Sequence, residues 1–502
     1  MGRLAVAAAV AAWAIPAAAL VDYIVPEPYM DEIFHVPQAQ QYCRGDFLTW
    51  DPMITTPPGL YYFSLAYVAS LFSGAWMIGL VETFDALCST AVLRSTNILL
   101  AMVCGVLFHD LLLCIHPGIG KSKATIYSIL VSLYPVHWFF TFLYYTDVAS
   151  LAAVLATYLF CLKKRFWVSA LFGAVSILFR QTNVIWIVFF AANGAVSYVQ
   201  DLHLKDTVSH ENNKLTHKLN KVVCDCDNKS TAQGLRRRRT NDPVSKQEVV
   251  RESIKVYSSL MEEILDISIK LWKSKFKLLI AFTPFAVVMV SFIAFVIWNG
   301  GIVLGAKEAH MVSLHFAQLL YFAIVSAAAL LPWHFTRSQA LDLLYWSGKN
   351  KLAVWMALGL SCTAVHFFSI AHPYLLADNR HYTFYVWRKI IQINWMMKYI
   401  LVPLYLYSWF SIIKILGRSQ TRVWVLSFVF SVGLVLVPAP LVEFRYYTIP
   451  FIILVLHSPV LGHAELLALG SIYAVIDLVT LAMFLFRPFH WEHEPGTQRF
   501  MW

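Results

Sequence analysis

Two adjacent acidic residues, Asp31 and Glu32, begin a polar segment in a chain that is otherwise strongly apolar. If residues 31–41 form a short helix, Asp31, His35 and Gln38 lie on one face of that helix. A carboxylate beside an imidazole is able to act as a general base. The same spacing also fits an acidic first helical turn that the helix dipole favours. Both interpretations are compatible with the spacing.

Other polar residues gather between apolar runs and carry both signs of charge. Arg180 precedes a polar hairpin tip, Gln181 to Asn183, where its side chain could also simply extend to the membrane interface. The remaining candidates are Asp51, which follows Trp50, then His372, Asp378, Arg380, His381 and Tyr382 in one motif, and Glu443 and Arg445 in another.

Arginine binds phosphate oxygens through a planar fork of donors. A phosphate at a membrane surface belongs to a phospholipid head group or to a lipid-linked phosphosugar. Aromatic residues near these charges, such as Tyr374 and Tyr446, fit either stacking on sugar rings or the aromatic belt of any membrane protein.

The composition excludes a soluble globular protein. Of 502 residues, 59% are hydrophobic and 14% are charged, against about 25% charged in an ordinary soluble domain. The formal net charge is +10. In a membrane protein, an excess of lysine and arginine beside the spans reflects the orientation of the chain in the membrane. No nucleic-acid partner is therefore expected.

Apolar runs that approach the roughly 20 residues needed to cross a bilayer recur along the whole chain. The first run could also be a cleaved signal peptide. We expect spans at 4–21, 96–115, 124–143, 147–162, 166–180, 183–199, 276–299, 314–334, 352–372, 391–414 and 423–441, with one or two more between 449 and 486.

The hydrophilic stretch 200–275 contains Arg236–Arg239 and has the composition of a disordered loop. The positive-inside rule places it in the cytosol. The polar clusters then share the opposite face. The chain divides into an N-terminal membrane part (1–199), this loop and a C-terminal membrane part (276–502).

The first non-cytosolic loop is unusually long. With Arg3 cytosolic and residue 95 on the other side, no single crossing fits between them, unless one short span has been miscounted elsewhere. We therefore expect residues 22–95 to form one loop, with Leu60–Leu80 lying along the membrane or re-entering it. Cys43 and Cys88 both fall in this loop, where a bridge between them is an open alternative.

Several signatures are missing from the sequence. The sequence contains no GxxxxGK[ST] loop, so nothing in it suggests ATP-driven transport. It also contains no HExxH, DxD or EF-hand pattern, so no metal site is indicated. No cofactor is expected. Few charges lie inside the expected spans, whereas an ion-coupled transporter would place some near the midplane.

Three long motifs resemble those of the endoplasmic-reticulum dolichyl-phosphate-glucose-dependent α-1,2-glucosyltransferase family. They are EPYMDEIFHVPQAQQYCRGDFLTWDPMITTPPGLYY, HPYLLADNRHYTFYVWRKI and EFRYYTIPF, with WNGGIVLGAKEAHMVSLHFAQLLYF at 298–322 between the first two. The likeness spans nearly the whole chain apart from 200–275.

The resemblance implies an all-α, GT-C-type bundle of about 12–14 spans in the endoplasmic-reticulum membrane, with its site facing the lumen. It implies transfer of glucose from dolichyl phosphate glucose to the diglucosylated oligosaccharide on dolichyl diphosphate, with inversion in one displacement. Asp31 takes the place of the family's catalytic base, with Glu32 as runner-up, and Asp51 fits a second acidic position. Arg380, His381 and Arg445 are the candidates to stabilise the departing phosphate.

Two competing functions remain at this point. One is a GT-C enzyme that uses another lipid-linked sugar such as mannose, because composition and spacing do not separate the two sugars. The other is a transporter or an accessory subunit of a channel, in which the arginines bind lipid and the acids serve structure. The large polar first loop argues against a transporter, whose substrate groups lie near the midplane.

Overall fold

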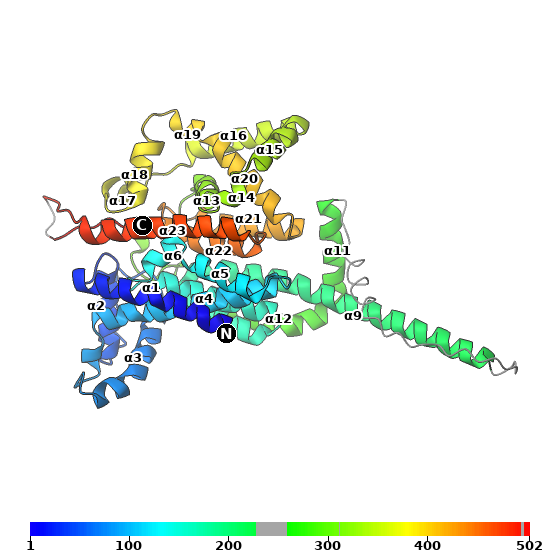
Figure 1. Ribbon diagram of the computed structural model, residues 1–502, viewed down its shortest axis with the longest axis horizontal. Helices are drawn as coiled ribbons and strands as arrows, with labels where there is room; N and C mark the ends of the chain where they lie inside the picture. Colours follow the sequence, from blue (N-terminus) through cyan, green and yellow to red (C-terminus); the bar gives the residue numbers. More distant parts are fainter. Residues whose placement is uncertain (227–258, 311, 493–495) are drawn as a thin grey trace. The chain divides into compact units, whose positions relative to one another are not determined.

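The computed structural model describes residues 1–226, 259–310, 312–492 and 496–502 (Figure 1). These residues are predominantly helical, and the only strand-like pairings among them are two isolated bridges. Six of the described helices are long and apolar enough to cross a membrane, and six shorter apolar helices accompany them. The prediction of an all-α polytopic membrane protein is confirmed.

Two compact units form the described chain: residues 1–191 with 284–502, and residues 192–283. The division into parts 1–199, 200–275 and 276–502 stays a prediction from composition. The helices up to the hydrophilic stretch are α1 (Gly2–Ile24), α2 (Glu32–Cys43), α3 (Gly59–Met77), η1 (Asp85–Leu87), α4 (Thr90–Ile115), α5 (Lys121–Ser132), α6 (Pro135–Phe140), α7 (Thr146–Leu162), α8 (Phe166–Phe179), η2 (Gln181–Asn183) and α9 (Val184–Cys226).

Many of the later helices are shorter. They are α11 (Leu260–Lys273), α12 (Lys275–Asn299), η3 (Lys307–His310), α13 (Ala317–Ala329), α14 (Leu331–His334), α15 (Arg337–Lys349), α16 (Lys351–Phe367), α17 (Pro373–Ala377), α18 (Tyr382–Val386), η4 (Trp387–Ile391), α19 (Met397–Ile400), α20 (Val402–Leu416), α21 (Arg422–Leu436), η5 (Phe444–Tyr447), α22 (Thr448–His457) and α23 (His463–Phe486).

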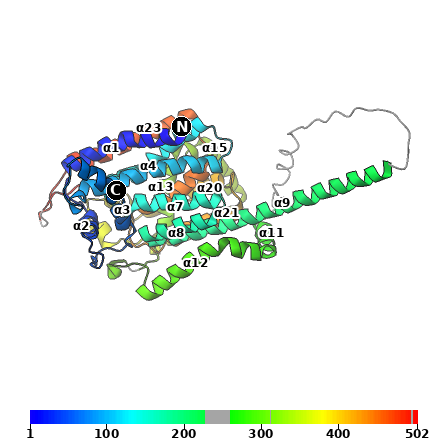
Figure 2. The same cartoon turned by 90° about the horizontal axis from the view of Figure 1, so that it is seen from below.

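Helix α1 is an integral part of the larger unit. Its buried residues recur every three or four positions, from Val6 through Val10 and Ala14 to Val21, which aligns them on one face. The helix packs against α4 and α5, and α1 and α4 run together in both views (Figures 1 and 2). Helix α1 is also one of the six candidate membrane spans of the described residues.

The polar clusters that begin at Asp31 lie at one end of the larger unit. The charged residues around Arg3, which the sequence assigns to the cytosolic face, lie at the other end. Asp110, at the end of α4, pairs with Arg3 at 2.7 Å and with Lys163 at 3.8 Å. Helices α2, α17 and α18 lie at the other end of the long helices (Figure 1). The two sets of residues thus lie at opposite ends of the unit, and the compartment that each end faces stays a prediction.

Helix α3 crosses the direction of the long helices (Figure 1), and it is not among the candidate spans of the described chain. This agrees with the expectation for Leu60–Leu80. Val68 of α3 is buried together with Leu87 and Cys88. A disulfide joins Cys43 to Cys88 across 45 residues, which confirms the bridge left open by the sequence.

We expect the double substitution of Cys43 and Cys88 by serine to destabilise the first loop. A cross-link of this loop length stabilises a fold by about 2–4 kcal/mol. The apparent melting temperature of purified protein in detergent should fall in the double variant. Cys362→Ser, at a free cysteine, is the control and should leave the melting temperature unchanged; equal effects would contradict the structural role of the bridge.

Two expected spans, 124–143 and 391–414, differ from the structure. The span 124–143 is broken into α5 and α6, because Pro135 lacks an N–H and restricts Tyr134 to an extended conformation. The span 391–414 is helical only from Met397 onward. The two helices α22 and α23 occupy the region 449–486, in agreement with the one or two spans expected there.

The smaller unit contains most of α9, all of α11 and the start of α12. Where the sequence predicts disorder, the structure has helix to Cys226 and again from Leu260. In α11 the Ser259 side chain caps the first turn by accepting from the Glu262 N–H at 3.2 Å, and Asp266 pairs with Lys270. Residues 227–258, with the arginine run, lie outside the described residues.

Candidate active site

Asp31 lies immediately before the first residue of α2. Its Oδ2 accepts a hydrogen bond from Arg445 Nη1 at 2.9 Å, although the two residues are 414 positions apart. Its backbone N–H donates to the Tyr145 hydroxyl at 3.1 Å. The Asp31 side chain is nevertheless 40% exposed, so the carboxylate is held on one side and accessible on another.

Burial and neighbouring charges set the ionisation states of Asp31 and His35. Burial raises the pKa of Asp31, but the Arg445 guanidinium and further positive groups outweigh it, so the pKa lies below its ordinary value. Burial lowers the pKa of His35 to about 4, against an opposing effect of Asp31. At neutral pH Asp31 is therefore ionised and His35 is neutral.

Glu32 is fully buried in a network of its own. Its Oε1 accepts from Arg94 Nε at 2.9 Å and from the Tyr144 N–H at 2.6 Å, and its Oε2 accepts from Arg94 Nη2 at 2.7 Å and from the Tyr29 N–H at 3.0 Å. Arg94 also donates to Asp22 at 2.9 Å. Four hydrogen bonds occupy the acceptor sites of a carboxylate, so Glu32 is placed to fix α2 against α4.

Arg445 connects two acids and two aromatic rings. Its Nε donates to the Glu443 carboxylate, while its Nη1 donates to Asp31. The guanidinium carbon lies 5.8 Å from the centre of the Tyr145 ring and 5.9 Å from that of Tyr446, within the range of cation–π attraction. These contacts hold the cation directly beside the exposed carboxylate.

Arg180 lies in the same cluster, where its side chain is paired with a carboxylate. Its Nη1 and Nη2 contact the two Asp147 oxygens at 3.1 and 3.2 Å, and its Nε donates to Thr146 at 3.2 Å. Its guanidinium carbon lies 6.0 Å from the centre of the Tyr446 ring. Both Arg180 and Arg445 thus contact Tyr446.

The other candidates in the first loop hold the loop together. His35 Nδ1 lies 2.6 Å from the Tyr61 hydroxyl. Gln38 donates to the Thr49 carbonyl at 2.8 Å and accepts from the Asp51 N–H at 2.9 Å. Gln38 therefore braces the chain around Asp51.

This loop is paired with a distant one. The Leu304 N–H donates to the Thr55 carbonyl at 3.1 Å, and the Ala306 N–H donates to the Pro52 carbonyl at 3.0 Å. Between them, a Cβ on Gly305 would lie 2.2 Å from the Pro52 oxygen. Only glycine allows the two backbones to approach this closely.

We therefore expect Gly305→Ala to push the two loops apart. The clash is with backbone atoms, including the Ile54 oxygen at 2.5 Å, and overpacking of this kind costs about 1–3 kcal/mol. Gly301→Ala, where no atom lies within 4 Å of the added carbon, is the matched control. Thermal unfolding of the purified variants measures the difference; equal stability of the two would show that the loops do not depend on this contact.

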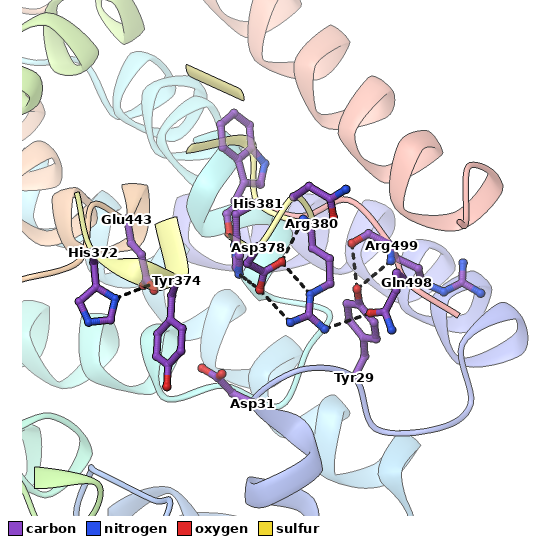
Figure 3. Close-up of polar contacts among 12 residues, drawn as sticks. Tyr29, Asp31, His372, Tyr374, Asp378, Arg380, His381, Glu443, Gln498 and Arg499 are labelled. Atoms are coloured by element: carbon purple, nitrogen blue, oxygen red, sulfur yellow. Dashed lines mark hydrogen bonds and ion pairs between the residues drawn. The ribbon is translucent and has the colours of Figure 1, made fainter. Parts of the chain in front are cut away.

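The motif 372–382 forms a second cluster (Figure 3). His372 caps α17 by accepting from the Tyr374 N–H at 3.2 Å. Arg380 Nε and Nη2 donate to the two Asp378 oxygens at 2.8 and 2.7 Å. His381 Nε2 lies 3.8 Å from the same carboxylate, so Asp378 links the Arg380 and His381 side chains.

The last described residues complete this cluster. Arg380 Nη1 donates to Gln498 Oε1 at 3.0 Å. His381 Nδ1 lies 3.0 Å from the Trp502 oxygen, and the Tyr382 and Trp502 ring centres are 5.2 Å apart.

Comparison with known proteins supports the resemblance of the motifs. A sequence profile of the DIE2/ALG10 family matches residues 25–456. The chain belongs to this family. A relative from Arabidopsis thaliana is 50% identical over the full length of both chains. Relatives from Mus musculus and Yarrowia lipolytica are 35% and 30% identical, each over 95% of this chain and 93% of their own length.

These three relatives carry the name Dol-P-Glc:Glc(2)Man(9)GlcNAc(2)-PP-Dol alpha-1,2-glucosyltransferase. No solved structure matches the chain. The family profile contains every site residue expected from the sequence, from Asp31 to Arg445, but it ends before α23 and the residues that follow it.

Within this family member the structure gathers the expected residues into two groups. Asp31, Arg445, Glu443 and Arg180 form one group through direct contacts or a shared aromatic ring. Asp378, Arg380 and His381 form the other. His381 also lowers the pKa of Asp31, so the two groups interact electrostatically. Glu32 instead pairs with Arg94, and Gln38 hydrogen-bonds to Thr49 and Asp51.

Residues that the sequence interpretation missed hold these groups in place. Arg94 and Asp147 are charged residues next to apolar runs, a signal that could have identified them. Tyr29, Gln498 and Arg499 carried no such signal, because nothing in the sequence relates the end of the chain to the first loop.

The arrangement supports a definite chemistry. An ionised, accessible carboxylate is able to take a proton from a hydroxyl group. Guanidinium and imidazole groups in the two clusters are able to stabilise negative charge on a phosphate.

Proposed function

We propose that the protein transfers glucose from dolichyl phosphate glucose to the Glc2Man9GlcNAc2 oligosaccharide on dolichyl diphosphate, forming an α-1,2 linkage. Similarity over the whole chain to relatives with this name supports the proposal. The structural observation that carries it is the contact of Asp31 with Arg445, since it pairs an accessible base with a cation on one side of a polytopic bundle.

The reaction we infer is a single displacement. The 2-hydroxyl oxygen of the acceptor's terminal glucose attacks C1 of the donor glucose, and the bond from C1 to the phosphate oxygen breaks. The electron pair of that bond leaves with dolichyl phosphate. Asp31 accepts the proton of the attacking hydroxyl. Inversion at C1 converts the β-linked donor to an α-linked product.

Geometry separates the roles of the cations in this proposal. In an in-line displacement the leaving phosphate lies on the far side of the sugar from the base. Arg445 touches Asp31, so its main role is to keep the base ionised and oriented. Arg380 and His381, which belong to the second group, are the candidates to meet the phosphate. Glu32 has its acceptor sites occupied, which favours Asp31 as the base.

We place the site in the lumen of the endoplasmic reticulum. The disulfide between Cys43 and Cys88 lies in the same loop as Asp31, and such bonds persist in oxidising compartments. The lysine and arginine residues of the opposite end support the same orientation. The lipid bilayer and the two dolichol-linked substrates are the partners in this proposal.

Purified protein in detergent, supplied with dolichyl phosphate glucose and the diglucosylated lipid-linked acceptor, tests the activity. The expected product gains one hexose that an α-1,2-specific glucosidase removes. Dolichyl phosphate mannose is the comparison donor. Preferred use of mannose would indicate a different lipid-linked sugar, and no transfer by monodisperse protein with its disulfide intact would favour a transporter or accessory role.

A further inference from the structure

The segment 496–502, which we name the strap, is built into the second polar cluster (Figure 3). The Tyr382 N–H donates to the Met501 carbonyl at 3.0 Å, and the Met501 N–H donates to the Arg380 carbonyl at 2.9 Å. These bonds form a parallel bridge beside His381. Met501 and Gln498 are both buried. The strap is thus packed against the motif that carries Arg380.

The same strap also holds the first loop. The Tyr29 hydroxyl donates to the Arg499 carbonyl at 2.8 Å and accepts from the Arg499 N–H at 2.8 Å. Arg499 is itself fixed, because its Nη1 donates to the Phe484 and Leu485 carbonyls at the end of α23. Tyr29 is therefore anchored through its hydroxyl to a rigid part of the bundle.

A strained turn separates Tyr29 from Asp31. Met30 has a φ of 56°, a left-handed conformation that is unfavourable for a residue with a side chain. Such a conformation persists only where the flanking groups are fixed. On one flank the strap holds Tyr29, and on the other Arg94 holds Glu32. Asp31 lies between these two anchors.

We propose that the strap positions the catalytic apparatus by fixing Tyr29, and through it Asp31, against the cluster that carries Arg380. The inference rests on the proposed glucosyl transfer. Tyr29 and Gln498 are positioning residues in this proposal, since they act through Asp31 and Arg380. The family profile ends at residue 456, so this role belongs to a part of the chain that the profile does not include.

Tyr29→Phe is the sharpest test, because it removes the hydroxyl and keeps the ring that packs against Phe484 at 5.6 Å. We expect kcat to fall about 10- to 100-fold, as for misplacement of a catalytic group by about 1 Å, with little change in KM. Asp31 would also sit less closely against Arg445. The pKa of Asp31 would then rise. As the pH is lowered, the variant would therefore lose activity at a higher pH than the wild type does.

Gln498→Leu tests the other end of the strap, since leucine keeps the volume and removes the acceptor for Arg380. We expect a higher KM for the donor. Tyr23→Phe is the matched control, at an exposed tyrosine of α1, and it should behave as the wild type. If Tyr29→Phe keeps the wild-type kcat and pH profile, the proposal is overturned. A fall in activity that only matches a loss of folded protein would also overturn it.

Hydrogen–deuterium exchange separates this proposal from the proposed function, because it needs no activity. Exchange at residues 29–35 should rise in Tyr29→Phe, and exchange at residues 380–384 should rise in Gln498→Leu. Unchanged exchange in both variants would overturn the strap as a positioning element, whatever the substrate. An inactive wild type with altered exchange in the variants would instead count against glucosyl transfer alone.

Discussion

Asp31→Asn is expected to reduce glucosyl transfer by about 10²–10⁴-fold, the contribution typical of a general base. The amide keeps the size of the side chain but does not accept the proton of the acceptor hydroxyl. Because Asp31 is 40% exposed and its carboxylate makes one ion pair, folding should change little. Initial rates at saturating donor and acceptor, compared with melting temperatures, measure the two effects separately.

Asp85→Asn is the matched control for this variant. Asp85 lies in η1 of the same loop and has no contact with the two polar clusters. Its substitution should leave the rate unchanged. Full activity in Asp31→Asn would remove Asp31 as the base, and Glu32 and Asp51 would be the next acids to test.

Glu32→Gln is expected to act on stability, with a loss of about 3–5 kcal/mol, because it removes the fully buried partner of a buried ion pair. Arg94 is almost fully buried, and its other carboxylate partner, Asp22, is 26% exposed. A neutral amide at position 32 would leave the guanidinium with a single charged partner. The measurement is the apparent melting temperature together with the rate per folded molecule.

Arg3→Met provides the comparison at an exposed pair. Arg3 is 63% exposed and contacts Asp110, so its loss should cost at most about 1 kcal/mol. If Glu32→Gln melts like the wild type but has lost transfer, Glu32 takes part in the chemistry. That result would reverse the roles we assign to the two adjacent acids.

The membrane-spanning architecture was largely predictable from the sequence, because a chain in lipid must satisfy its backbone hydrogen bonds within each segment. Long apolar runs such as the one that forms α4 therefore identify helices directly. Breaks in such runs were less predictable. The expected span 124–143 contains Pro135, whose effect on the backbone is local, but only the structure shows that the helix ends at Ser132.

Asp31 was identified by its motif, and Arg445 by its unusual position on the face away from the cytosol. Their contact was not predictable, because it joins residues 414 positions apart and sequence periodicity describes only near neighbours. Spacing alone did not separate Asp31 from Glu32, and only the family resemblance favoured Asp31. The structure separates them, since one is accessible and the other is buried against Arg94.

The sequence by itself therefore determined the class of protein, the approximate spans, the polar motifs between them and the family resemblance. These features depend on local composition, on charge bias and on long motifs. The tertiary structure alone decided which acid is accessible, which cations neutralise it, and that the strap reaches Tyr29. These features depend on packing between distant segments, where burial and hydrogen-bond geometry give chemically similar residues different roles.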